Sequence, residues 1–180
     1  HRWLEEAETA VRQALKISPQ ASSHHALGRI LEATGQPQAA CSEYLLAIRD
    51  YPGYYDAECD LAWAFLNQNQ MKESEQHFLA ATRLRPDYWL TYNYLGFLYN
   101  SVARYPEAEK MFTEAILLAP DNVSPDGNLI GVYHNSGQND KIPILVSQVH
   151  FSIRLERRAP HVGFQVVDPV EPASVGLETV

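Results

Sequence analysis

A period of 34 residues constrains this chain more than any other feature of its sequence. Proline marks the period at Pro52, Pro86 and Pro120. Leucine, alanine and aromatic positions recur at the same interval, as in the sets Leu27, Leu61 and Leu95; Ala47, Ala81 and Ala115; and Tyr44, Phe78 and Phe112. A period between about 20 and 50 residues is typical of a solenoid, in which each unit packs on its neighbours. We therefore expect a stacked repeat array rather than one globular core.

Each unit has the pattern of a helical hairpin. In residues 89–122, apolar side chains follow the spacing of one helix face over about 89–102, and a second apolar stripe runs to about Leu118. Pro106 can begin the second helix without losing a hydrogen bond, and Pro120 ends it. The same pattern predicts repeats at 21–54 and 55–88. The expected fold class is all-α, built from antiparallel helix pairs.

These positions resemble the tetratricopeptide repeat family, whose pattern of Trp, Leu-Gly, Tyr, Ala, Phe, Ala and Pro spans 34 residues. The resemblance covers 21–122 and implies a right-handed α-solenoid, the tetratricopeptide-like superhelix. Ser74 departs from the pattern because it stands where Ala is usual, and His24, Glu58 and Tyr92 stand where Trp is frequent. We expect these departures to soften the packing locally and to leave the fold unchanged.

The two ends of the chain differ from the central units. Residues 1–20 have the pattern of only the second helix of a unit, which predicts a truncated repeat and a chain that is a piece of a longer protein. A fourth unit is expected at 123–158, where an atypical helix at about 140–157 caps the array. Residues 159–180 contain three prolines and no Lys or Arg, so we expect a linker or a poorly ordered tail.

The sequence offers little for catalysis, metals or cofactors. The seven histidines are scattered, and no His-Glu-x-x-His, paired-cysteine, glycine-rich phosphate or Gly-x-Ser-x-Gly motif occurs. We expect no enzymatic activity, no cofactor and no metal within this segment. A net charge of -8, from 22 acidic and 14 basic residues, disfavours nucleic acid as a partner.

Membrane insertion is not expected either, because no stretch approaches the roughly 20 apolar residues that a span requires. Cys41 and Cys59 belong to no paired motif, and we interpret them as thiols in a reducing compartment. This cysteine usage favours a cytoplasmic location.

The resemblance to the tetratricopeptide family implies a concave groove, lined by first helices, that binds a protein or peptide. The candidate groove residues are Arg29, Tyr55, Trp63, Asn67, Asn93, Phe97, Asn100 and His134. Trp63 and Phe97 are expected to stack with apolar side chains of the ligand, and the asparagines to bond its backbone. In the competing interpretation, the two aromatic rings pack on adjoining helices, on upstream repeats or on residues 159–180.

The family's clamp for a terminal carboxylate is absent in the register that takes 21–54 as the first repeat. The positions of its basic and amide side chains carry His25, Arg29, Asp60, Leu90 and Tyr94. A scaffold for protein interaction is therefore the expected function, with a different ligand chemistry. Two alternatives stay open: a regulatory or sensing region of a larger bacterial-style kinase, cyclase or transcription regulator, and a structural repeat that self-associates into a homo-oligomer.

Overall fold

A computed structural model describes residues 2–120 and 122–142 of the chain. This part is entirely helical outside its turns, and none of it forms a strand. The helices are α1 Arg2–Ile17, α2 Ala21–Ala33, α3 Pro37–Asp50, α4 Tyr55–Asn67, α5 Met71–Leu84, α6 Trp89–Ser101, α7 Tyr105–Leu118 and α8 Val123–Asn135. The all-α prediction is confirmed. Within the described ranges, no helix is both long enough and apolar enough to cross a bilayer.

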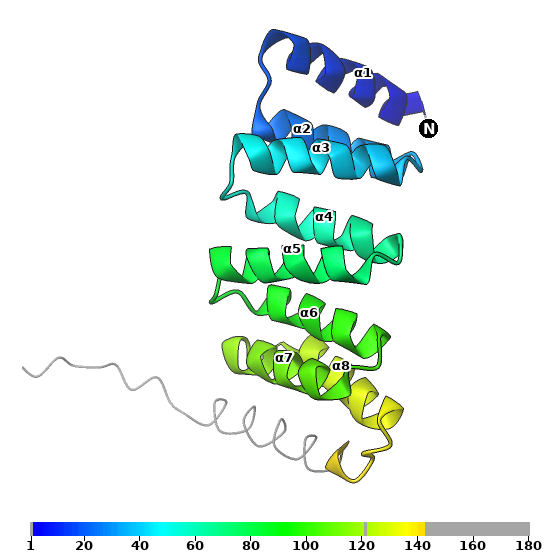
Figure 1. Ribbon diagram of the computed structural model, residues 1–180, viewed down its shortest axis with the longest axis vertical. Coiled ribbons are helices and arrows are strands. Elements are labelled where there is room, and N and C mark those ends of the chain that lie inside the picture. The colour runs from blue at the N-terminus through cyan, green and yellow to red at the C-terminus, as the bar shows by residue number, and fades with distance from the viewer. Residues whose placement is uncertain (1, 121, 143–180) are drawn as a thin grey trace, which may run out of the picture.

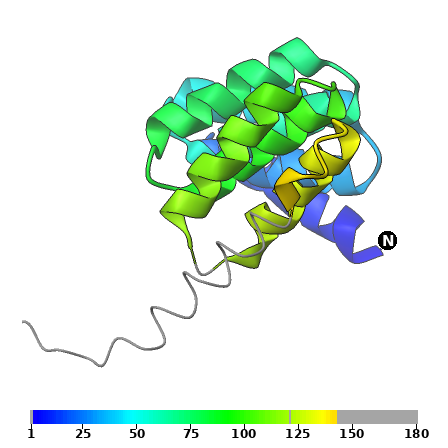
Figure 2. The ribbon, with the colours of Figure 1, turned by 90° about the horizontal axis from the view of Figure 1, so that it is seen from below.

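The helices form one stack in chain order, from α1 at one end to α8 at the other (Figure 1). The most extensive contacts lie within the pairs α2–α3, α4–α5 and α6–α7, and smaller ones join each pair to the next. Seen from below, the pairs lie over one another in a single column (Figure 2). Contacts of this kind between sequence neighbours define a solenoid, as the period predicts.

Each turn inside a helix pair uses the same backbone device. The residue in the left-handed region lies at the same repeat position every time, with φ of 79° at Gly35, 61° at Asn69, 59° at Ala103 and 75° at Gly137. In each turn the N–H of the following residue donates to a carbonyl five residues earlier, for example Gln36 to Leu31 at 2.8 Å. This is the Schellman arrangement, which satisfies the last carbonyls of the first helix.

The core repeats with the same period as the sequence. Tyr44, Phe78 and Phe112 are fully buried, one in each second helix. Two of these rings pack against glycine in the first helix of their own pair, because a Cβ added at Gly28 or Gly96 would lie 2.5 or 2.7 Å from the ring. The small residues therefore let the paired helices approach closely.

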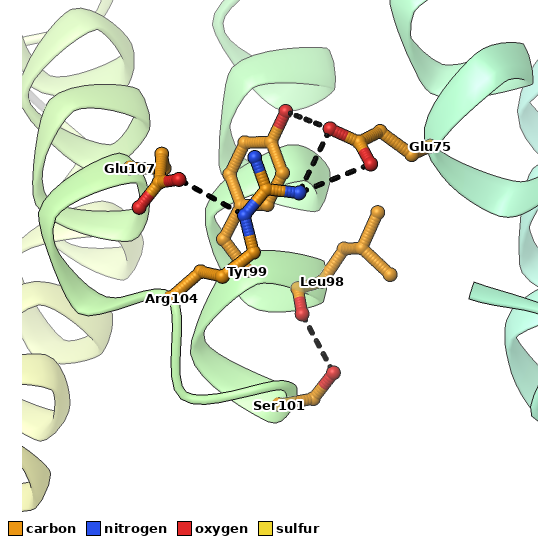
Figure 3. Close-up of polar contacts among 6 residues, drawn as sticks. All are labelled: Glu75, Leu98, Tyr99, Ser101, Arg104 and Glu107. Atoms are coloured by element: carbon orange, nitrogen blue, oxygen red, sulfur yellow. Dashed lines mark hydrogen bonds and ion pairs between the residues drawn. The ribbon is translucent and has the colours of Figure 1, made fainter. Parts of the chain in front are cut away.

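A polar cluster joins the second helix of one pair to the next pair (Figure 3). The Tyr99 hydroxyl donates to Glu75 at 2.8 Å, and Arg104 donates to both Glu75 oxygens at 3.0 and 3.1 Å. Arg104 also donates to Glu107 at 3.0 Å and lies 4.3 Å over the Tyr99 ring. Burial, assisted by Glu75, raises the pKa of Tyr99 to about 12. Glu75 thereby ties α5 to both α6 and the turn that follows it.

The predicted repeat boundaries fall between helix pairs, and their assignment as separate units stays a prediction. α1 lies within residues 1–20 and packs on α2. Nearly all of the capping helix predicted at about 140–157 lies outside the described residues, and so does the whole of 159–180.

Candidate partner-binding groove

The first helices of the pairs contact one another along one side of the stack. α2 contacts α4, and α6 contacts α8, although a second helix separates the members of each couple in the sequence. No two second helices share an interface of that extent within residues 2–120 and 122–142. Elements on the inside of a curved stack lie closer together than those on the outside. The first helices α2, α4, α6 and α8 therefore share the side of the stack that we predict to be the concave face.

Polar side chains connect these first helices from one pair to the next. His25 on α2 lies 2.8 Å from Asp60 on α4, and the Tyr55 hydroxyl of α4 lies 2.7 Å from the Thr91 hydroxyl of α6. Burial is the main cause of a raised pKa at Tyr55, so its hydroxyl is protonated at neutral pH. Arg29 reaches to 3.9 Å from Asp60, but its side chain is 70% exposed and contributes little to stability there.

Asparagine pairs continue this row of contacts from α6 to α8. The side-chain NH₂ group of Asn128 donates to the side-chain oxygen Oδ1 of Asn93 at 2.8 Å. The NH₂ group of Asn135 donates in the same way to Oδ1 of Asn100 at 3.2 Å. A carboxamide can donate two hydrogen bonds and accept two more. Each of these contacts uses one NH₂ and one carbonyl group, so the other group of each side chain is available for a further partner.

Trp63 and Phe97 meet at the centre of the face, with ring centroids 5.6 Å apart and planes tilted by 46°. Trp63 also packs edge to face with Phe78 and Tyr94, and it is half-buried. Phe97 keeps 45% of its surface exposed. Trp63 thus packs on adjoining helices, as in the competing interpretation of the sequence, while Phe97 presents an apolar surface to solvent.

The remaining candidates are exposed and lie near the ends of first helices. Asn67 is the last residue of α4, and His134 is the second-last residue of α8. Of the eight residues predicted for the groove, five lie in close contacts between neighbouring first helices, namely Tyr55, Trp63, Asn93, Phe97 and Asn100, and Arg29 makes a longer contact with Asp60. Arg29, Asn67 and His134 add exposed polar groups around this central set.

A pocket of about 150 Å³ opens beside Trp63, between α4 and α6. Its lining residues are Tyr55, Asp56, Cys59, Asp60, Trp63, Arg85, Tyr88, Leu90 and Tyr94. The Arg85 guanidinium lies 4.0 Å over the Tyr88 ring and 4.9 Å over the Tyr55 ring. Burial raises the pKa of the Cys59 thiol to about 12, so this cysteine stays protonated and unreactive at neutral pH.

The sequence interpretation missed the contribution of Asp56, Arg85 and Tyr88 to this pocket. Arg85 and Tyr88 lie in the turn between α5 and α6, outside the helix faces from which the groove was predicted. The signal available in the sequence is the tyrosine that precedes the first helix in consecutive units, Tyr54 and Tyr88, one period apart.

Comparison with known proteins defines the class of this fold. Residues 56–88 match the family model described as tetratricopeptide repeat. The crystal structure of MamA has a TM-score of 0.74 at 17% identity, covering 87% of this chain and 92% of that chain. BtubC (BKLC) from P. vanneervenii has a TM-score of 0.71 at 20% identity, with 98% and 81% covered. PilF of Pseudomonas aeruginosa has a TM-score of 0.68 at 20% identity, with 81% and 68% covered.

The protein is therefore an all-α helical repeat protein of the solenoid class. The resemblance to the tetratricopeptide repeat family is confirmed, because residues 56–88 match the repeat itself and the whole described stack has the corresponding fold. At these low identities the solved structures show the fold alone. No curated protein matches the chain in sequence. Repeat scaffolds of this fold generally bind proteins and lack catalysis of their own.

Proposed function

We propose that this segment is a protein-interaction scaffold that holds a stretch of a partner protein against the concave face of α2, α4, α6 and α8. The observation that carries the proposal is the exposed Phe97 ring, which lies on Trp63 at the middle of this face with asparagine pairs alongside. An apolar anchor surrounded by amide groups suits an extended segment, since its side chains and its backbone both need partners.

Each candidate residue has a distinct part in this proposal. Phe97, supported from behind by Trp63, takes an apolar side chain of the ligand. The side-chain NH₂ groups of Asn93 and Asn100, which their pairs with Asn128 and Asn135 do not use, donate to the backbone of the ligand. Tyr55 joins α4 to α6 through its contact with Thr91. The exposed side chains of Arg29, Asn67 and His134 form the polar rim of the concave face.

Two further readings of the same segment remain proposals. A regulatory region of a larger kinase, cyclase or transcription regulator would use the same concave face, with a ligand from its own chain or from an effector protein. Self-association would instead use exposed repeat faces and would appear in light scattering as a mass above 20.3 kDa. We propose a cytoplasmic location, which the two unpaired cysteines Cys41 and Cys59 favour.

Affinity capture tests the proposal with two matched double variants of the chain. Trp63→Ala with Phe97→Ala removes the aromatic pair from the concave face. Leu45→Ala with Leu79→Ala removes two exposed leucines, one period apart on the second helices α3 and α5. We expect partners captured from a native lysate by the unmodified chain to be lost with the first variant and retained with the second.

Circular dichroism must show unchanged helix content in both variants, because Trp63 also packs against the core residue Phe78. Phe97→Ala alone is the milder variant, since this ring is partly exposed. Capture that persists without the aromatic pair, or that depends on the leucines, would contradict the proposal.

A further inference from the structure

The pocket between α4 and α6 is too small for a cofactor and has room for a single side chain. Its volume is about 150 Å³. Sites for drug-sized molecules and cofactors usually occupy roughly 300–1,000 Å³. The pocket lies directly beside the Trp63–Phe97 pair, so a partner segment on the concave face would pass its mouth. The chemistry of its lining then decides which side chain it accepts.

Two carboxylates lie at the pocket on one face of α4, Asp56 and Asp60, four residues apart. Like charges at this spacing repel each other on a helix. His25 lies 2.8 Å from Asp60, and Arg29 approaches it to 3.9 Å. Asp56 is exposed and forms no ion pair with any basic side chain of the described residues. At least one carboxylate at the pocket is therefore not neutralised by the protein.

Four aromatic residues line the pocket: Tyr55, Trp63, Tyr88 and Tyr94. Trp63 and Tyr94 meet edge to face, with centroids 5.2 Å apart. Tyr55 and Tyr88 already hold a guanidinium, because Arg85 lies over both of their rings. The negative face of an aromatic ring attracts Lys and Arg side chains, and Trp does so most strongly. A second cation, placed between Trp63 and the carboxylates, would meet both kinds of attraction.

Arg85 supports a rival reading, in which the pocket binds an acidic side chain. Its guanidinium plane is stacked on tyrosine, which leaves N–H groups at the edge available to a carboxylate. Against this, Asp56 at the pocket has no basic partner among the described residues, and the chain as a whole carries a net charge of -8. The unpaired carboxylate and the long-range field both favour a cation.

We propose that the pocket between α4 and α6 binds one basic side chain, Arg or Lys, of the partner segment. Asp56 and Asp60 supply the opposite charge, and Trp63 and Tyr94 supply the aromatic surface. This inference rests on the proposed function, because it names the residue type by which a ligand on the concave face is recognised.

The test uses small probes, so it does not depend on knowing the partner. N-acetyl-arginine amide, N-acetyl-lysine amide, N-acetyl-glutamine amide and N-acetyl-glutamate amide are titrated separately into the ¹⁵N-labelled chain. The indole N–H signal of Trp63, assigned with a Trp63→Phe variant, reports on the pocket. We expect the arginine and lysine probes to shift this signal with saturation, the effect to weaken with added salt, and the glutamine and glutamate probes to leave it unmoved.

A charge-matched pair of variants separates the pocket from the general field of the protein. Asp56→Asn with Asp60→Asn should weaken binding of the arginine probe about tenfold, as expected when a charge-assisted contact is lost. Glu73→Gln with Asp140→Asn removes the same charge from exposed positions that do not line the pocket, and should leave the affinity within about twofold.

Three results would overturn the inference. The first is a Trp63 signal that no basic probe shifts, and the second is equal weakening by both charge-removing variants. The third is a response to the glutamate probe that is lost in Arg85→Leu, which would make the pocket an anion site.

Failure of the basic-side-chain pocket can be distinguished from failure of the proposed function. If partner capture still required Phe97 but tolerated Asp56→Asn with Asp60→Asn, the groove would stand and the basic side chain would not.

Discussion

At the scale of single residues, one buried position of the second helices shows how a single hydroxyl group affects stability. Ala40, Ser74 and Ala108 occupy the same repeat position, and all are fully buried. The sequence predicts a local softening at Ser74. The structure locates its physical source in the hydroxyl, because Oγ has no hydrogen-bond partner among the described residues.

Ser74→Ala should stabilise the protein by about 1–2 kcal/mol, because it removes a buried and unsatisfied polar group without changing the packing volume much. Urea unfolding followed by circular dichroism measures the difference. Ala108→Ser is the reverse change at the equivalent position and should destabilise by a similar amount. A Ser74→Ala protein no more stable than the unmodified chain would show that the hydroxyl is satisfied in solution.

Only some residues of the predicted groove could be placed from the sequence, for a physical reason. Trp63 and Phe97 could be placed side by side because the period superimposes equivalent helix positions. Arg85 and Tyr88 were not predicted because they lie in a turn, outside the helix faces that the spacing of apolar residues defines, although the recurrence of tyrosine at Tyr54 and Tyr88 was an available signal. The degree of burial could not be predicted either: Trp63 packs on neighbouring helices, and Phe97 keeps 45% of its surface exposed.

At the scale of the helix, two glycines in first helices differ in whether the packing requires them. Gly96 in α6 is required by packing, since a Cβ there would lie 2.7 Å from the fully buried Phe112 ring. Gly131 in α8 has no such neighbour, because a Cβ there would meet nothing within 4 Å among the described residues. The two glycines therefore differ in what an added methyl group would do.

Gly96→Ala should destabilise the protein by about 1–3 kcal/mol, because the ring has no space to move away. Gly131→Ala should stabilise it by about 0.5–1 kcal/mol, through the better helix propensity of alanine. Thermal unfolding of the two variants under identical conditions measures both signs. The helix-packing account fails if Gly96→Ala is neutral, or if both substitutions change stability in the same direction.

Helix boundaries were the most predictable elements of the fold. Residues 89–102 and an end at about Leu118 were expected for one pair, and the helices run over Trp89–Ser101 and Tyr105–Leu118. Proline and glycine carry this information, because they fix or free the backbone locally. The cluster of Glu75, Tyr99 and Arg104 was not predicted, since it depends on how far one pair is displaced against the next.

At the scale of the whole molecule, the stack behaves as a one-dimensional array. Each pair contacts mainly the pairs before and after it, so a change in one repeat affects its immediate neighbours. These neighbour contacts include the ones between first helices, which run along one side of the stack from α2 to α8. This row gives the array a continuous face, and the proposed function depends on which face a partner uses.

Site-specific photocrosslinking tests that claim most directly. Benzoylphenylalanine is introduced in place of Asn67 on the concave side or of Leu79 on the outer side, two exposed positions that the core does not need. Each protein is irradiated with the partner that the unmodified chain captures. Our account predicts a covalent adduct from the position of Asn67 and none from that of Leu79. An adduct formed only from the outer position would contradict it.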